Sequence, residues 1–278
     1  MNLWVLDLIL CAILLARSWP AVSGFAIALA AHIKLYPLVL LAPWGALKKR
    51  LVVVFAVTGF LAIVFVQTGW GRDWRWWSQF LAFAPRFPAH THFRNNSVYC
   101  LVQNAFTAAG EALGVDGAAV GIAARAAVFV ITAAIIAWFV VRFVKRERIL
   151  SRLEPNGGVA GGPSRETVRF FSHTVDALSL VMLISPTVWE HHYVFALPII
   201  IWAYATRVND RPWLVSLGSF LILALPTFDV FLLSHHRLVG LLILVFCTAP
   251  APLRYEPGGT VSDLGRAGAK AVPLRPTP

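Results

Sequence analysis

The chain has 278 residues, of which 58% are hydrophobic and only 13% are charged, and its mean hydropathy is +0.71. This composition excludes a soluble globular protein, which has no way to cover so much apolar surface, and predicts a polytopic membrane protein. The formal net charge of +11 would suit a nucleic-acid-binding protein, but the positions of the basic residues, described below, argue against that class.

Three apolar runs open the chain, at residues 3–16, 21–33 and 35–47. Each is shorter than the roughly 20 residues that cross a bilayer comfortably. We predict a short helical hairpin with basic residues at its ends and the sequence IKLYP, residues 33–37, at its tip. The alternative, one long proline-kinked helix, would place Lys34 at mid-membrane, which is costly for a charged side chain.

The next part of the chain alternates between apolar spans and aromatic or polar segments. Residues 51–68 predict a full span, and 118–141 predict a second one. Residues 69–97 are too rich in Trp, Arg, Pro and His to lie in lipid, so we predict an outer, ligand-facing loop. Its four tryptophans would lie at headgroup level, although they would equally suit a sugar or a lipid tail. Residues 98–113 predict an amphipathic helix along the interface.

The composition changes again at residue 142. Basic residues flank the Gly-rich sequence NGGVAGGPS, so we predict a mobile, solvated cytoplasmic loop over residues 142–173. Two last apolar runs, 213–225 and 238–247, precede a tail rich in Pro, Gly and Arg. We predict that residues 251–278 are a disordered cytoplasmic tail.

These segments together predict an all-α fold, a polytopic transmembrane helical bundle of about nine membrane segments that includes short hairpin helices. Residues 1–250 would form one transmembrane domain. If the segments alternate, most basic residues fall at one face, which the positive-inside rule makes cytoplasmic. The net charge is then explained by topology, and we expect a multi-pass protein of the cell membrane that contacts membrane lipids and no nucleic acid. The opposite, outer face collects Lys34 and seven of the eight histidines: His32, His90, His92, His191, His192, His235 and His236.

The most informative stretch is SPTVWEHHYVFALP, residues 185–198. A helix that reaches Ser-Pro is expected to end or kink there, because proline lacks an N–H and disfavours helical geometry in the preceding residue. We therefore predict that four side chains lie close together just after the break: Trp189, Glu190, His191 and His192. Ionisable groups at a bilayer boundary indicate function, although an ordinary interfacial turn with aromatic belt residues would also fit.

The predicted outer face has the groups for chemistry on a phosphate. A histidine can act as acid, base or phosphate partner, and cations such as Lys34, Arg94 and Arg237 can neutralise a phosphate leaving group. The histidine spacing does not match a zinc site, so we expect no metal and no other cofactor. The sequence NNS, residues 95–97, is typical of sugar contacts, but Asn95 and Asn96 could equally cap the following helix.

Three segments in this order, AAHIKLYPLVLL, NNSVYCLVQ and SPTVWEHHYVFALP, resemble glycosyltransferase family 87, over residues 3 to about 247. These are GT-C-type, polyprenol-phosphate-mannose-dependent α-mannosyltransferases. The resemblance implies a GT-C-like membrane enzyme that moves mannose from a polyprenyl-phosphate donor to a glycolipid or lipoglycan acceptor at the outer face. It implies catalytic roles for His191 and His192. The substrate-binding candidates, some from the family motifs and Arg94 from the outer loop, are Lys34, Tyr36, Arg94, Asn96, Ser97 and Trp189.

One part of the family pattern has no counterpart in the sequence. Family members have further helices ahead of the segment that begins here at Leu3, with an acidic catalytic base in their first outer loop. Neither Asp7 nor Asp73 corresponds to that base. We therefore consider Glu190 as a substitute base, and an inactive truncated paralogue as an alternative. The competing class is a flippase or transporter of lipid-linked sugars, which would also use outward cations, aromatic residues and broken helices.

Overall fold

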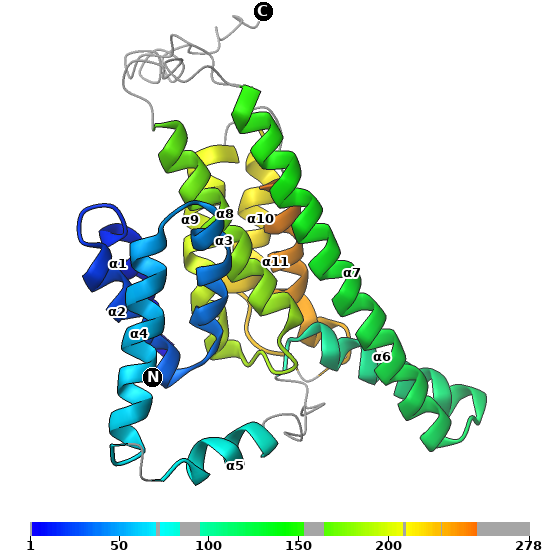
Figure 1. Ribbon diagram of the computed structural model, residues 1–278. Coiled ribbons are helices and arrows are strands. Elements are labelled where there is room, and N and C mark those ends of the chain that lie inside the picture. Colours follow the sequence, from blue (N-terminus) through cyan, green and yellow to red (C-terminus); the bar gives the residue numbers. More distant parts are fainter. Residues whose placement is uncertain are drawn as a thin grey trace, which may run out of the picture.

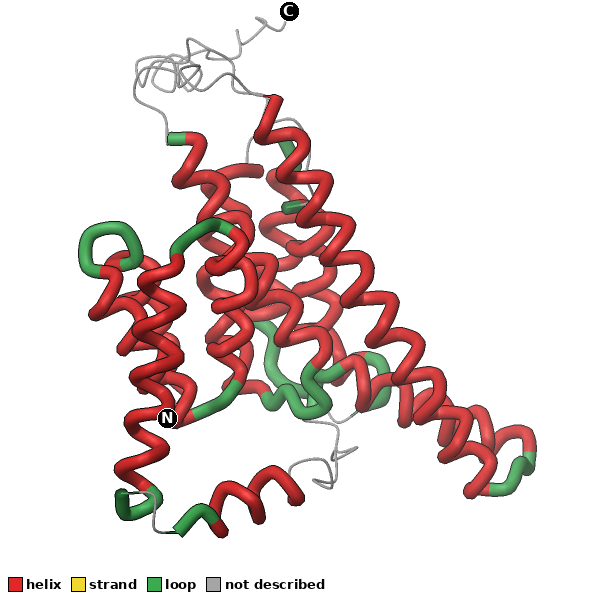
Figure 2. The backbone as a smooth tube through the Cα atoms, in the orientation of Figure 1, coloured by secondary structure: helices red, strands yellow, loops and turns green. Residues whose placement is uncertain are grey.

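The computed structural model describes residues 2–70, 73–83, 95–152, 164–207, 210–228 and 230–248. Within these residues the secondary structure consists of eleven α-helices, three short 3-10 helices and one isolated bridge between Asn95 and Trp189 (Figure 2). The predicted all-α class is therefore confirmed. The predicted tail, residues 251–278, lies outside the described residues.

The first four helices form an antiparallel group on one side of the molecule (Figure 1). They are α1 (Asn2–Leu15), α2 (Pro20–Ile33), α3 (Leu41–Ala46), which follows the 3-10 helix η1 (Tyr36–Leu40), and α4 (Arg50–Gln67). The chain reverses direction between α2 and η1, so Lys34 lies in a turn and the predicted hairpin is confirmed. Helix α2 packs against α1 and α4. Gly24 permits this approach, because a Cβ there would lie 2.5 Å from the carbonyl oxygen of Val52.

The central part of the chain contains four helices, two of which are the longest in the described residues. The four are α5 (Arg75–Phe83), α6 (Val98–Leu113), α7 (Gly117–Arg152) and α8 (Arg165–Ile184), and the two longest are α7 and α8. The predicted outer loop thus includes a short helix. The predicted cytoplasmic loop over residues 142–173 is wrong at both ends, because α7 continues to Arg152 and α8 begins at Arg165.

The last part of the chain packs on α8. It comprises η3 (Glu190–Ala196), α9 (Leu197–Arg207), α10 (Pro212–Leu223), η4 (Leu233–His235) and α11 (His236–Cys247). Helices α10 and α11 form a close pair in which Gly218 and Gly240 face each other. A Cβ on Gly240 would lie 2.7 Å from the carbonyl oxygen of Gly218, so the two backbones approach as small residues allow in membrane proteins.

Helices α4, α7 and α8 are each long and apolar enough to cross a membrane, and five shorter apolar segments accompany them in the described part of the chain. Large apolar side chains on α7, such as Phe129 and Ile122, are exposed, as expected of a lipid-facing helix. Most of α8 is instead buried inside the bundle. The total of about nine membrane segments stays a prediction.

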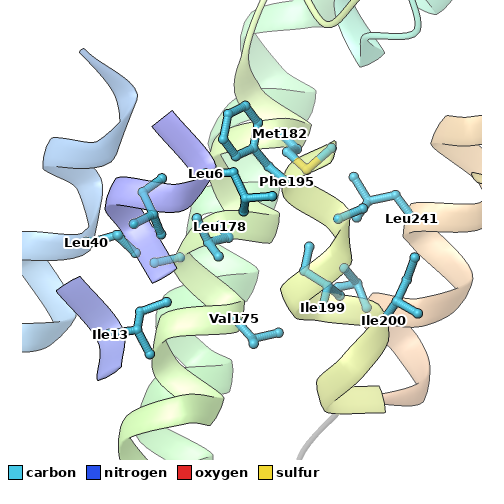
Figure 3. Close-up of a cluster of buried hydrophobic side chains, with 14 of the residues drawn as sticks. Leu6, Ile13, Leu40, Val175, Leu178, Met182, Phe195, Ile199, Ile200 and Leu241 are labelled. Atoms are coloured by element: carbon cyan, nitrogen blue, oxygen red, sulfur yellow. The ribbon is translucent and has the colours of Figure 1, made fainter. Parts of the chain in front are cut away.

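The hydrophobic core lies around α8 (Figure 3). Val175, Leu178 and Met182 on this helix meet side chains from both ends of the sequence. The surrounding residues include Leu6, Ile13, Leu40, Phe195, Ile199, Ile200 and Leu241. Helix α8 therefore joins the N-terminal group of helices to the C-terminal group.

A buried ionic cluster explains why the chain stays helical beyond residue 141. Arg142 Nε donates to both carboxylate oxygens of Asp176 at 2.9 Å, and Arg146 also binds this carboxylate. Arg142 donates to the carbonyl oxygens of Val245 and Thr248 at 2.7 Å, at the end of α11. The carboxylate and these carbonyl groups satisfy the two guanidinium groups, which are otherwise costly to bury. The cluster ties α7, α8 and α11 together.

Replacing Asp176 with Asn should test this role. The substitution leaves Arg142 and Arg146 buried without a counter-ion and should lower the free energy of unfolding by about 3–5 kcal/mol. Thermal unfolding of the purified protein in detergent measures the effect. Glu166→Gln, which breaks the exposed ion pair with Lys49, is the control and should change stability by less than about 1 kcal/mol. Equal melting temperatures for both variants would contradict a stabilising role for the cluster.

Candidate functional site

The site begins where α8 breaks. The helix ends at Ile184, and Ser185, the residue before Pro186, has extended backbone angles (φ −64°, ψ 130°), as the residue before a proline prefers. The chain stays extended to Trp189 (φ −72°, ψ 159°), and η3 starts at Glu190. The predicted break is confirmed.

The sequence NNS braces this extended segment. The N–H of Val188 donates to Asn95 Oδ1 at 2.8 Å, while Asn95 Nδ2 donates to the carbonyl oxygen of Pro186 at 3.0 Å. Ser97 Oγ donates to the same carbonyl at 3.0 Å, and the N–H of Asn96 donates to the carbonyl oxygen of Val188 at 2.8 Å. These contacts supply partners for backbone groups that the broken helix leaves unpaired.

The burial of NNS changes the expected role of two residues. Asn95, Asn96 and Ser97 are each 0% exposed. Ser97 also accepts a hydrogen bond from the N–H of Cys100 at 3.0 Å and so caps α6. The helix is therefore capped by Ser97, and not by Asn95 or Asn96, the two residues that the sequence suggested as caps. In this conformation neither Asn96 nor Ser97 has surface for the substrate contact that the sequence suggested.

The structure brings together Lys34 and His192, which lie 158 residues apart in the sequence. Lys34 follows α2 in an extended conformation (φ −152°, ψ 129°), and its Nζ lies 2.8 Å from His192 Nε2. The other ring nitrogen, Nδ1, accepts the backbone N–H of Trp189 at 2.9 Å. In return, the N–H of His192 donates to the carbonyl oxygen of Trp189 at 2.8 Å. This exchange resembles a capping box and fixes the imidazole at the start of η3.

Burial controls the charge of this cluster. It lowers the pKa of His192 to about 3, and the neighbouring Lys34 and His191 add to that effect. Burial also lowers the pKa of Lys34. His191 is exposed, but partial desolvation of its ring and the nearby Lys34 lower its pKa as well. The imidazole of His192 is therefore neutral across the physiological pH range.

An open cavity of about 600 Å³ adjoins Lys34. Its wall comes from the end of α2, the following turn, the end of α4 and the amphipathic helix α5. It is mostly apolar, with Lys34, His32, Tyr36, Gln67, Thr68 and Trp77 among its lining residues. His32 stacks on Phe60, with a ring distance of 4.4 Å. A cavity with a lysine and apolar or aromatic walls suits an anionic lipid.

Tyr36 lies between this cavity and a second, smaller one of about 50 Å³ that His192 lines. Its ring packs edge-on against Phe195 at 4.9 Å. Within the described residues its hydroxyl group has no hydrogen-bond partner. Buried hydroxyl groups are normally hydrogen-bonded, so this one is placed to bind water or a ligand.

The remaining predicted residues divide into two groups. Glu190 and Trp189 are half-buried at the start of η3, and the carboxylate of Glu190 lies near enough to raise the pKa of His191. Arg94 lies outside the described residues, as do His90 and His92.

No group of three His, Cys, Asp or Glu side chains in the described ranges is arranged to hold a metal ion. The sequence analysis did not identify Asn95 as the residue that braces the broken helix. Its neighbours in the sequence do not show that its side chain contacts the backbone of residues 186–188.

Comparison with known proteins gives one match. The model of glycosyltransferase family 87 matches residues 1–154, which is more than half of the chain. This range includes Lys34, Tyr36 and NNS, and it ends before Ser185. No curated protein and no solved structure matches the chain significantly.

Replacing Asn95 with Ala should loosen the site. The change removes the acceptor of the buried Val188 N–H, and a buried backbone group left unpaired costs about 1–3 kcal/mol. It also removes one of the two donors to the Pro186 carbonyl, which keeps the hydrogen bond from Ser97. We expect a lower melting temperature in detergent. Asn104→Ala on α6, which removes a contact of 3.4 Å to the Cys100 sulfur and leaves the backbone of residues 186–188 paired, is the control. If the two variants melt alike, the brace contributes no specific stability.

Proposed function

Because the chain belongs to glycosyltransferase family 87, we propose that it transfers mannose from a polyprenyl-phosphate donor to a glycolipid or lipoglycan acceptor. The observation that carries the proposal is the contact of 2.8 Å between Lys34 and His192 beside the open cavity. This contact joins two of the three segments on which the resemblance rests, and it places a lysine and an imidazole at one point.

The donor phosphate is proposed to bind at Lys34. A lysine in a partly desolvated site interacts with a phosphate more strongly than it would in water. The hydroxyl group of Tyr36 offers a second donor at the same wall. The apolar lining of the cavity suits the first isoprene units of the donor, and Trp77 offers an aromatic surface to the sugar or the lipid.

Glu190 is the proposed base. It would accept the proton of the acceptor hydroxyl group as the bond between that oxygen and the anomeric carbon forms. The bond from the anomeric carbon to the phosphate oxygen breaks, and the electron pair leaves with the phosphate, whose charge Lys34 neutralises. His191, exposed beside His192 with a ring distance of 4.6 Å, is placed to contact the reacting groups.

The proposed reaction takes place at the outer membrane face. The turn after α2, the segment between α8 and α9, and helix α5 lie at one end of the bundle (Figure 1). The opposite end has the C-terminal ends of α7 and α9 and the turn between α3 and α4 (Figure 1). This turn includes Lys48 and Lys49 and leads into Arg50 at the start of α4. A basic face is cytoplasmic by the positive-inside rule. An outer site has no access to cytosolic nucleotide sugars, which favours a lipid-linked donor.

Lys34→Met should reduce transfer of labelled mannose from polyprenyl-phosphate mannose to membrane glycolipids. We expect kcat/KM to fall by about 100-fold or more, because the methionine cannot neutralise the leaving phosphate. Lys49→Met, at the opposite end of the bundle, is the control and should retain transfer. Wild-type kinetics in Lys34→Met would refute the assignment of Lys34 to the donor phosphate.

Glu190→Gln should separate chemistry from binding. The amide cannot accept the hydroxyl proton, so we expect transfer to fall by roughly 10²–10⁴-fold. Donor affinity, measured by calorimetry, should stay within about twofold, because Glu190 has no proposed contact with the phosphate. Unchanged transfer in this variant would remove Glu190 from the mechanism. Movement of lipid-linked sugar between the leaflets of vesicles without transfer would instead favour the transporter.

A further inference from the structure

The hydrogen bonds of His192 define where its proton lies. The backbone N–H of Trp189, which can only donate, points at Nδ1 at 2.9 Å. Nδ1 must therefore offer a lone pair, and this excludes the imidazolium form, in which both ring nitrogens carry hydrogen. A neutral imidazole has one N–H, so the hydrogen is on Nε2.

This tautomer determines the state of Lys34. The N–H of His192 Nε2 is directed at Lys34 Nζ, 2.8 Å away. An ammonium group has three donors and no acceptor, so two donors would face each other if Lys34 were charged. The contact is a hydrogen bond only when Nζ is a neutral amine that accepts the Nε2 hydrogen.

The surroundings agree with a neutral amine. Within the described residues no carboxylate forms an ion pair with Lys34. Among the described residues, the titratable groups near the pair are His191, beside His192, and two groups that line the cavity with Lys34, which are His32 and the hydroxyl group of Tyr36. None of these three is an anion. The carboxylate of Glu190, at the start of η3, favours the charged form of His191. Burial lowers the pKa of Lys34, because an unpaired charge is costly to desolvate.

We propose that His192 is a positioning residue that keeps Lys34 neutral while the site is empty, and that binding of an anionic lipid phosphate draws one proton from solvent onto Lys34. This inference rests on the proposed function. The step adds H⁺ to the amine to form an ammonium group, and no covalent bond in the donor changes. The hydrogen bond from Nε2 to Nζ is lost, and the ammonium group donates to a phosphate oxygen instead. The open cavity connects Lys34 to water.

The sign of the pH dependence follows from linkage. Lys34 has a lowered pKa in the empty site, and a bound phosphate raises it. Between these two values binding takes up a proton, so donor affinity should fall as pH rises, by up to about tenfold per pH unit. His192, with a pKa of about 3, does not titrate in this range.

Calorimetry on the full chain in detergent can count this proton. Farnesyl-phosphate mannose is a suitable probe, because a phosphodiester does not itself titrate near neutral pH. Titrations at pH 8 in buffers of different ionisation enthalpy should give an uptake of about one proton per bound donor. Lys49→Met, at the opposite end of the bundle, keeps the pair intact and should keep the uptake.

Two variants test the two members of the pair. Lys34→Arg, which stays charged, should bind the probe without proton uptake and with an affinity that does not depend on pH. His192→Gln offers Lys34 an amide oxygen in place of an N–H, so Lys34 should be charged in the empty site and the uptake should disappear. Melting temperatures close to that of the wild type show that these variants are folded.

The outcomes separate this inference from the function on which it rests. Binding by the wild type without proton uptake overturns the inference and leaves the donor assignment intact. Uptake that persists in Lys34→Arg also overturns it, because the proton then goes elsewhere. If the probe does not bind to the wild type at all, the proposed donor is wrong and the inference falls with it.

Discussion

The site depends on one interaction, the side-chain amide of Asn95 against the backbone of residues 186–188. A helix that stops near a membrane boundary leaves N–H and C=O groups that lipid cannot satisfy. The planar amide offers one acceptor, to the Val188 N–H, and one donor, to the Pro186 carbonyl. The Asn95 amide therefore replaces both the acceptor and the donor that a continuing helix would have supplied to these backbone groups. The direction of the Trp189 N–H toward His192 follows from this brace.

Helix α8 connects this brace to a second polar cluster. Asp176 in the same helix holds Arg142 and Arg146 of α7, and these arginines bind the end of α11. Most of the helix surface between Asp176 and the break at Ser185 is buried against both halves of the molecule. The hydrophobic contacts are non-directional, so the polar clusters supply the directional contacts at the middle of α8 and at its C-terminal end. The break therefore follows a helix that is held from Asp176 to its last turn.

Local chemistry could be predicted from the sequence, whereas pairing over long distances could not. The break before Pro186 and the span of α4 follow from neighbouring residues alone. The basic stretch after residue 141 was predicted as solvated loop because its counter-ion, Asp176, is 34 residues from Arg142. Asn96 has the composition of a sugar contact, but its burial depends on a segment about 90 residues away. The contact between Lys34 and His192 could not be predicted either, because these residues are 158 positions apart in the sequence.

The division of the site between two parts of the chain has a chemical consequence. The part that matches glycosyltransferase family 87, residues 1–154, provides the cation and most of the open cavity. The part beyond the match provides the imidazoles and the carboxylate of Glu190. The parts meet at Lys34 and His192, and also where Asn2 Nδ2 donates to the carbonyl oxygen of His191 at 3.0 Å. In the proposed mechanism, donor recognition and proton transfer therefore reside in different segments, so substitutions in the second segment should change the reaction while the cavity beside Lys34 is retained.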